Sequence, residues 1–358
     1  MKSPFALALL VLGAVSQHAQ NMPDTVIRTT TRLVEVRVIA EDSRGNAVTN
    51  LRREEFQVQD NGKAQTITSF SFEEGGGLSG AANAGSAGRS RDEYAVILLD
   101  WLNPRYADRI VVRDAVNMLL RDFQPRQRVA LYVLGRAPRF LHSFTSDPSE
   151  LLDILALTDD EPEDPFDPAK PGQLDARMKT WVTLTVEERL RSFDVKILDT
   201  IGALEKITGI LARLPGRKAI IWATNGFPIV LDERAVPGFG RGTVSYAQQV
   251  ERLMQHLNRA NVTLHTLDAR GMRAEPVPFH PYGDIGTLQE LASRTGGTAF
   301  SERNDLAAGM RQALEDGKTS YTLGFSVPLD AKAGLHEISL RTTRARLKLR
   351  YRRSYEIR

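Results

Sequence analysis

The sequence predicts an α/β fold: a doubly wound, mainly parallel sheet flanked by a β-sandwich-like domain that both ends of the chain build together. Two observations support this prediction. Between residues 93 and 317, short apolar strands alternate with longer helices, which is the rhythm of βαβ units with a parallel sheet. Before and after this region, residues 25–74 and 318–358 have the pattern of strands without helices.

The start of the chain has the features of a secretory signal peptide. Residues 1–16 combine a positively charged start with an apolar run over 5–15, and the small residues Ala14 and Ser16 precede a cleavage site before Gln17. The run is too short to span a bilayer, and no later run approaches the ~18 apolar residues that would be required. We therefore expect an exported mature protein, in the periplasm, at the cell surface or secreted, without a transmembrane segment.

Composition removes several classes of function. The net charge is only +3 over 358 residues, so the chain gives no nucleic-acid signal. It contains no cysteine, although an exported protein could use disulfides, so the fold must be held by its core. The same absence excludes thiol catalysis, cysteine-ligated zinc and iron–sulfur clusters.

The N-terminal β domain is expected over residues 25–74. A β-rich run covers 33–39, a second begins at Glu54, and the turn sequence 60–63 contains an Asn-Gly pair, which accepts positive φ at low cost. The alternation of polar and apolar residues that follows favours one more strand. Residues 75–92, rich in Gly, Ser and Ala, are expected to be a flexible linker.

The α/β domain is expected over residues 93–317. Its strands are apolar throughout, as strands covered on both faces must be, and its helices carry apolar residues three or four apart. Asp147 and Pro148 provide an N-cap and a favourable first helical residue. We expect strands at 95–99, 129–134, 139–144, 219–222, 262–267 and 298–300, the third of them at a sheet edge. We expect helices at 108–123, 147 onward, 186–214, 245–258, 287 onward and 304–314.

After Gly317 the chain returns to strands. In the last of them basic residues alternate with apolar ones, so that the cations should share one face. The candidate binding residues on that face are Arg346, Lys348 and Arg350. One interpretation is an exposed face whose charge discourages edge aggregation. The alternative is a platform for an anionic envelope polymer, a lipid surface or an acidic protein.

The two groups of terminal strands are expected to pair with each other. Each is too small to be stable alone and would leave its edges unpaired. Both flank the α/β domain in sequence, and the ends of an inserted domain usually lie close together. The apolar side chains Leu347, Leu349 and Tyr351 should then face the shared core.

Polar side chains follow the predicted parallel strands at their carboxyl ends, where doubly wound sheets bind ligands. Asp100 and Asn103 follow the first strand, Thr224 and Asn225 a later one, and Asp268 the next. Oxygen ligands of this kind suit Mg²⁺ or Ca²⁺. The alternative interpretation is that they cap loops and helix starts.

Several segments together resemble one family. In chain order they read RVALYVLG, FTSDPSEL, LPGRKAIIWATNGFP, LNRANVTLHTLDARG, LQELASRTGGTAF and YTLGFS, preceded by the N-terminal VRVIAEDSRGNAVTNLRREEFQVQDNGKAQTITSF. As a set they resemble the von Willebrand factor type A (VWA)-related exported proteins found in Acidobacteria. The likeness extends over nearly the whole mature chain.

The resemblance implies a metal site. At the positions of its ligands, this sequence departs from the family pattern. Asp100 matches the first Asp of the Asp-x-Ser-x-Ser motif, but Leu102 and Pro104 stand at the two Ser positions. Asn225 stands where the family has its last Asp, and residues 158–185 replace the loop that would supply a Thr. We therefore expect a degenerate site that binds Mg²⁺ or Ca²⁺ weakly or not at all. Asn103 and Asp268 are the residues that could compensate.

The sequence favours an interaction protein over an enzyme. It contains neither a Gly-x-Ser-x-Gly elbow nor a phosphate-binding Gly-Lys-Ser/Thr loop. The expected partner is a protein or the cell envelope, contacted through the carboxyl edge of the sheet, with Trp101 and Thr224 as contact residues. Two alternatives stay open: a metal-assisted hydrolase using Asp100 and Asp268, and a purely structural envelope protein. The acidic segment 159–167 is either a solvated loop or a site for a cation or a basic partner.

Overall fold

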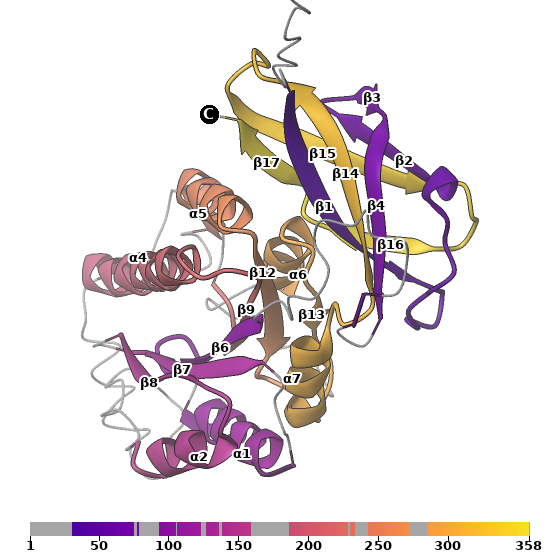
Figure 1. The fold of residues 1–358 in the computed structure, drawn as a ribbon. Coiled ribbons are helices and arrows are strands. Elements are labelled where there is room, and N and C mark those ends of the chain that lie inside the picture. Colours follow the sequence, from indigo (N-terminus) through magenta and orange to yellow (C-terminus); the bar gives the residue numbers. More distant parts are fainter. Residues whose placement is uncertain are drawn as a thin grey trace, which may run out of the picture.

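Two packed parts make up the protein, an α/β domain and a β domain (Figure 1). The computed structural model describes residues 31–74, 77–78, 93–104, 106–122, 127–135, 138–158, 186–227, 230–232, 243–272 and 285–357. The expected signal peptide, most of the linker and the acidic segment 159–167 lie outside these residues. Within them, no helix is long and apolar enough to cross a membrane.

The α/β domain is built on a six-stranded sheet in the order β13-β12-β9-β6-β7-β8. All neighbours run parallel except β8, which pairs antiparallel with β7 at the edge. Counted along the chain this is the doubly wound order, in which the first strand lies at the centre beside the fourth. The predicted fold class is therefore confirmed. The strands are β6 (Glu93–Asp100), β7 (Arg128–Leu134), β8 (Arg139–Thr145), β9 (Arg217–Thr224), β12 (Val262–Asp268) and β13 (Ala299–Phe300).

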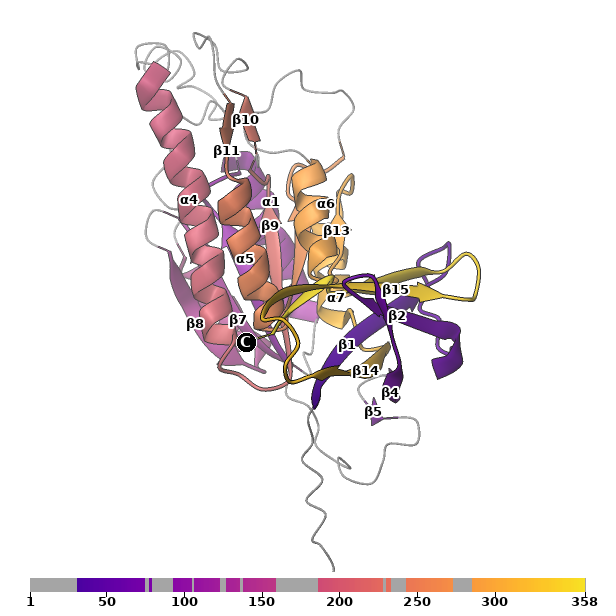
Figure 2. The same cartoon turned by 90° about the horizontal axis from the view of Figure 1, so that it is seen from above.

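Helices cover both faces of this sheet because its strands are apolar on both faces. In β6, Val96 and Leu98 point into a core shared with α4, α5 and α6, whereas Ile97 and Leu99 point into a core shared with α1, α2 and α7. Figure 2 shows α4, α5 and α6 along one face. The helices are α1 (Tyr106–Asp122), α2 (Pro148–Ala156), α4 (Val186–Leu211), α5 (Ala247–Arg259), α6 (Ile285–Arg294) and α7 (Leu306–Glu315). A small hairpin of β10 (Val230–Asp232) and β11 (Thr243–Ser245) lies at the end away from the β domain (Figure 2).

The β domain consists of two antiparallel sheets with one core between them. One sheet has the order β16-β1-β14-β4-β5 and the other β17-β15-β2-β3. The N-terminal members are β1 (Thr31–Glu41), β2 (Phe56–Asp60), β3 (Lys63–Gln65), β4 (Ile67–Glu74) and β5 (Gly77–Leu78), with a short 3₁₀ helix at Arg53–Glu55. The C-terminal members are β14 (Ser320–Pro328), β15 (Gly334–Thr342), β16 (Lys348–Tyr351) and β17 (Ser354–Ile357).

Both sheets combine strands from the two ends of the chain. β1 pairs with β14 and β16, and β2 pairs with β15. Buried side chains from both sheets, such as Val36, Phe325 and Leu340, form a single cluster. Leu347, Leu349 and Tyr351 pack against that cluster, as the alternation in the sequence predicted.

Deletion of residues 336–358 should therefore destabilise the N-terminal strands. The truncation removes most of β15 and all of β16 and β17, which leaves the β2–β3 hairpin without its neighbour, and an isolated hairpin is marginal in water. We expect the amides of β2 and β3 to lose their hydrogen-exchange protection. Amides that stayed protected in the truncated protein would show that the two β segments are independent.

The last of the strands expected after Gly317, with alternating basic and apolar residues, is not continuous. The chain forms two short strands that pair with different sheets, β16 with β1 and β17 with β15. Arg346 precedes them in a left-handed conformation, with φ of 62°. Between the two strands, Arg352 forms a backbone bridge to Thr295 of the α/β domain. The Arg353 amide donates to Arg294 O at 3.3 Å, and Arg353 O accepts from the Ile338 amide of β15 at 2.8 Å.

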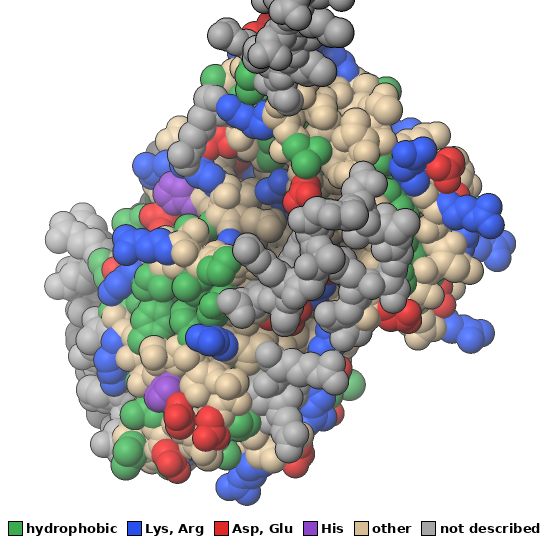
Figure 3. Space-filling view, viewed as in Figure 1, with side chains coloured by type: hydrophobic (Ala, Val, Ile, Leu, Met, Phe, Trp, Pro, Cys, Tyr) green, Lys and Arg blue, Asp and Glu red, His purple; other side chains and the backbone are tan. Residues whose placement is uncertain are grey.

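The basic residues Arg346, Lys348 and Arg350 consequently do not share one exposed face. Lys348 and Arg346 are exposed, but the Arg350 side chain is only 9% exposed and forms ion pairs with Glu41 and Asp316 at 2.7 and 2.5 Å. Burial of a guanidinium against two carboxylates removes it from any surface platform, which corrects the assignment of Arg350 as a binding residue. On the face shown in Figure 3, Lys and Arg are interspersed with Asp and Glu.

We expect the stability of the protein to depend on pH through His265 of β12, whose side chain is 2% exposed. Burial lowers the pKa of His265, and its Nδ1 accepts a hydrogen bond from the Thr298 amide at 3.2 Å, so the folded protein holds a neutral ring. Between the ordinary pKa of about 6.5 and the lower folded value, only the unfolded chain binds the proton. The contribution of His265 to stability is therefore complete above pH ~6.5 and is lost as the pH falls.

We expect the His265→Gln variant to lose less stability than the unaltered protein as the pH falls. Urea unfolding of both proteins between pH 8 and pH 5 measures it, because glutamine has a similar acceptor and does not titrate. Parallel stability curves for the two proteins would contradict the assignment.

Candidate functional site

The candidate site lies at the carboxyl ends of β6 and β9, the neighbouring strands between which the sheet order reverses. β6 ends at Asp100 and β9 ends at Thr224, with Asn225 next along the chain. Asp268 ends β12 on the far side of β9, opposite Thr224. The expected site residues are thus at one edge, but Asp100 and Asp268 are two strands apart, about 10 Å for the usual strand spacing.

Asp100 is completely buried and its carboxylate accepts five hydrogen bonds. Oδ1 accepts from the backbone amides of Leu102 at 2.9 Å and Asn103 at 3.0 Å. Oδ2 accepts from Asn103 Nδ2 at 2.8 Å, Trp222 Nε1 at 3.1 Å and Thr224 Oγ1 at 2.6 Å. A carboxylate offers about four lone-pair positions, so the protein's own donors saturate this one.

Asn103 extends this network from β6 to a helix. Its Nδ2 also donates to Thr200 Oγ1 of α4 at 3.0 Å, and the Thr200 hydroxyl donates to Lys196 O at 2.7 Å. Asn103 therefore positions the loop after β6, and its side-chain nitrogen donates hydrogen bonds to two groups of the protein.

Asn225 occupies the position that the resemblance assigns to an Asp ligand. It is fully buried, and its Nδ2 donates to Asp108 Oδ2 of α1 at 2.9 Å. Its Oδ1 is buried with no hydrogen-bond partner among the described residues. This oxygen is the one acceptor at the site that the protein itself, as far as it is described, leaves unsatisfied.

Asp268 is held by a neighbouring arginine. Arg270 Nε and Nη2 approach its two carboxylate oxygens at 2.6 and 2.8 Å, and the Arg270 amide donates to Oδ1 at 3.0 Å. The side chains are 3% and 6% exposed. A buried guanidinium fork of this kind neutralises the carboxylate.

These contacts do not fit a tightly bound divalent cation. N–H and O–H donors point at the Asp100 carboxylate, Arg270 neutralises Asp268, and the apolar Leu102 and Pro104 stand at the hydroxyl positions. Across the described residues, no three His, Cys, Asp or Glu side chains are grouped as metal ligands.

Trp101 is not a contact residue of an open surface. Its side chain is 3% exposed and belongs to the core under α1, α2 and α7, because the strand direction turns it into the sheet's second face. Sequence analysis missed Met272, which is 65% exposed just beyond Asp268. The Met272 amide donates to Asn304 Oδ1 at 2.8 Å. No sequence signal distinguishes it from a buried apolar residue.

Neither Lys348 nor Arg346 joins this site. Both lie in the β domain, which packs against the amino edge of the parallel sheet, where β6, β9 and β12 begin. The predicted binding residues thus divide between two opposite ends of the α/β domain.

Comparison with known proteins gives likenesses of fold only. No family model matches the sequence, and no curated protein matches it. Similar solved structures include an aerotolerance-related membrane protein from Bacteroides fragilis, with 13% identity, 62% of this chain and 98% of that chain covered, and a TM-score of 0.36. BatB from Bacteroides thetaiotaomicron has 15% identity, coverage of 62% and 97%, and a TM-score of 0.36. A von Willebrand factor type A protein from Catenulispora acidiphila has 10% identity, coverage of 85% and 72%, and a TM-score of 0.38.

The α/β domain has a VWA-like fold. The doubly wound order, the central β6 ending in Asp100 and the antiparallel edge strand β8 agree with the fold expected from the sequence.

Proposed function

We propose that this is an exported interaction protein that binds a protein or cell-envelope partner through the carboxyl edge of its VWA-like sheet, without catalysing a reaction. The saturation of the Asp100 carboxylate by five donors carries this proposal. Doubly wound sheets bind ligands in the crevice at this edge. In this protein a closed hydrogen-bond network around Asp100 lies there.

The same contacts count against the hydrolase alternative. A metal-assisted hydrolase needs carboxylates free to ligate a metal or to accept a proton from water. Asp100 is occupied by internal donors and Asp268 by Arg270. Strand β9, which ends at Thr224, lies between the strands that carry the two carboxylates.

An exposed apolar side chain at this edge supports a binding role. Met272 leaves 65% of its surface in solvent next to the site. Methionine is adaptable and is used at surfaces that bind proteins. Export rests on the signal-peptide features of residues 1–16.

We expect Mg²⁺ and Ca²⁺ to bind weakly, with a Kd above ~1 mM, or not at all. Calorimetry on the chelator-treated protein measures this, since released heat would report cation binding directly. Tight binding that Asp100→Ala abolishes would contradict the expectation and would require the Asp100 network to open.

The interaction itself is tested by photocrosslinking in the native envelope. A photoreactive amino acid replaces Met272 at the carboxyl edge. Its matched control replaces Met118 on α1, a methionine that is similarly exposed at 60%. We expect a discrete crosslinked product from position 272 and none from position 118.

Equal labelling from both positions would show contact without a specific site. The absence of any product from position 272 would favour the purely structural role. Digestion of the product by protease or by polysaccharide hydrolases then separates a protein partner from an envelope polymer.

A further inference from the structure

The outward face of α4, made of residues 195, 198, 199, 202, 206 and 209, carries two large apolar side chains in solvent. Val195 is 56% exposed and Leu198 is 47% exposed. The opposite face of the same helix is buried in the core of the α/β domain, through residues such as Leu204. α5 lies between α4 and the β domain, so the outward face of α4 is turned away from that domain (Figure 2). The helix therefore presents apolar side chains both to the core and to solvent.

Two glycines, Gly202 and Gly209, continue this face along the interior of the helix. Seven residues make almost two helical turns, so Val195, Gly202 and Gly209 fall on one line. A Cβ atom added at either glycine would meet nothing within 4 Å. Packing within the chain therefore does not require these glycines, although glycine in a helix interior is destabilising relative to alanine. The outward face consequently has a bulky half, at residues 195–198, and an open half, at residues 202–209.

The exposed charges of the outward face are divided in the same direction. Asp199 lies towards the N-terminal half of the helix and Lys206 towards the C-terminal half, and both side chains are exposed. Neither side chain forms a hydrogen bond or an ion pair with another residue that the structure describes. Glu205, next to Lys206, is half-buried and turned to α5, where its carboxylate lies 3.6 Å from His256 Nδ1.

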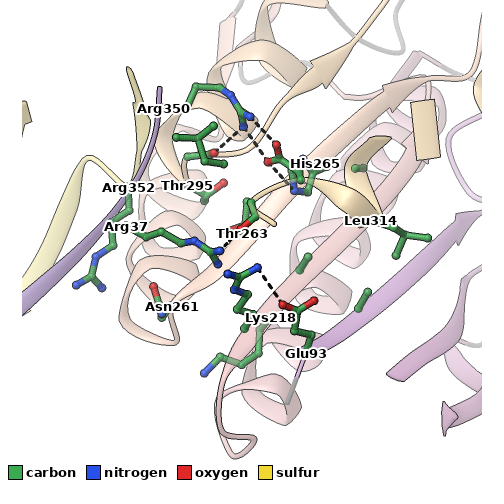
Figure 4. Close-up of a pocket in the computed structure, with 18 of the residues that line it drawn as sticks. Arg37, Glu93, Lys218, Asn261, Thr263, His265, Thr295, Leu314, Arg350 and Arg352 are labelled. Carbon is green, nitrogen blue, oxygen red and sulfur yellow. Dashed lines mark hydrogen bonds and ion pairs between the residues drawn. The ribbon is translucent and has the colours of Figure 1, made fainter. Parts of the chain in front are cut away.

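Charges between the two domains, by contrast, are matched within the chain. Arg350 meets Asp316 there, and Arg217 meets Glu93 (Figure 4). The outward charges of α4 differ from these, because only another molecule can supply their counterparts.

We propose that α4 is the interface of a two-fold symmetric dimer, in which it packs antiparallel against α4 of a second copy of this chain. A two-fold axis beside Gly202 places Asp199 of each copy opposite Lys206 of the other. The same axis places Val195 of each copy against Gly209 of the other. Acidic thus meets basic and bulky meets open in both directions, as an interface between identical surfaces requires. A parallel pair in register would instead set like charges against each other.

The contacts of this pair have different roles. Gly202 at the axis lets the two helices approach closely, because the distance between packed helices depends on the side chains at their contact. The charge pairs at the margin fix register and orientation more than affinity. One helix pair buries less than the about 1,200–2,000 Å² of a standard stable interface, so we expect a weak, reversible dimer. Because the helices run in opposite directions, the carboxyl edges of the two sheets would point away from each other and stay accessible.

Analytical ultracentrifugation of the purified protein over a range of concentrations tests the proposal. We expect a reversible equilibrium between monomer and dimer. Leu198→Glu should weaken the dimer about tenfold, because it places a charge in an apolar contact. Met118→Glu on α1 is the matched control, since Met118 is similarly exposed at 60%, and it should leave the equilibrium unchanged.

Gly202→Ala separates docking from folding. The added methyl group meets nothing within the chain and alanine favours the helix, so Tm measured in dilute solution should rise. The same methyl group would lie at the two-fold axis, so the dimer should weaken severalfold. A higher Tm together with an unchanged dimer would overturn the proposal.

Reversal of the charges tests the antiparallel register. Asp199→Lys alone should weaken the dimer, and the double variant Asp199→Lys, Lys206→Asp should restore it, because both ion pairs form again with the signs exchanged. A double variant that is no stronger than the single one would contradict the pairing of these residues. Protein that stays monomeric at every concentration, or a dimer that Leu198→Glu and Met118→Glu weaken equally, would overturn the proposal as well.

Discussion

Replacement of Asp100 by alanine should lower the free energy of unfolding by about 3–5 kcal/mol, as expected when one partner of a buried charged network is removed. The change leaves the Trp222 Nε1, Thr224 and Asn103 donors buried without their acceptor. Urea unfolding in metal-free buffer measures the effect.

Asp100→Asn is the matched variant, because the amide keeps the shape and one acceptor oxygen. It should lose less stability than Asp100→Ala. A wild-type stability that depends on added Mg²⁺, with no loss for Asp100→Ala in chelator, would instead show that Asp100 serves a metal.

Arg350→Met should cost a similar amount, about 3–5 kcal/mol, because it leaves the carboxylates of Glu41 and Asp316 without their shared cation. The effect should appear as loosening between β16 and the α/β domain, measurable by hydrogen exchange. Lys348→Met on the same strand is the control, and its exposed side chain should change stability by no more than ~0.5 kcal/mol.

The Arg350→Met difference should shrink in acid. Burial acts to raise the pKa of Asp316, but the hydrogen bond from Arg350 and the neighbouring positive charge outweigh it, and the pKa lies below its usual 3.8. The Asp316 contribution is thus complete above pH ~4 and is lost as the pH falls through the lower folded value. Without Arg350, burial still raises the pKa of Asp316 while the hydrogen bond that lowers it is gone, so protonation removes a less favourable charge. A difference that grew below pH 4 would contradict this account.

Local sequence patterns predicted the elements well where one residue type decides the structure. The Asp147–Pro148 start of α2 is present, with Asp147 Oδ1 accepting from the Ser149 amide at 2.9 Å. The start of the helix expected over 245–258 is wrong by two residues, since Ser245 pairs in β11 and α5 begins at Ala247. A cross-strand pairing between β10 and β11 overrides the local signal there.

The candidate site was predictable as a position but not as a set of contacts. Apolar strands ending in Asp100, Thr224 and Asp268 place these residues at one edge, since parallel strands end together. That Trp222 donates to Asp100 depends on the register between β6 and β9, in which Leu98 is opposite Trp222. Register between strands more than 100 residues apart is a tertiary property.

The C-terminal strand shows which features the sequence by itself determined and which it did not. Alternation of basic and apolar residues by itself determined which side chains share a face, because successive side chains of a strand point to opposite sides, and Leu349 indeed packs on the β core. Only the tertiary structure decided what the basic face meets. The α/β domain covers Arg350 and Arg352 and leaves Lys348 in solvent, because burial depends on which surfaces dock, and docking is set by the shape and charge of a domain that lies elsewhere in the chain.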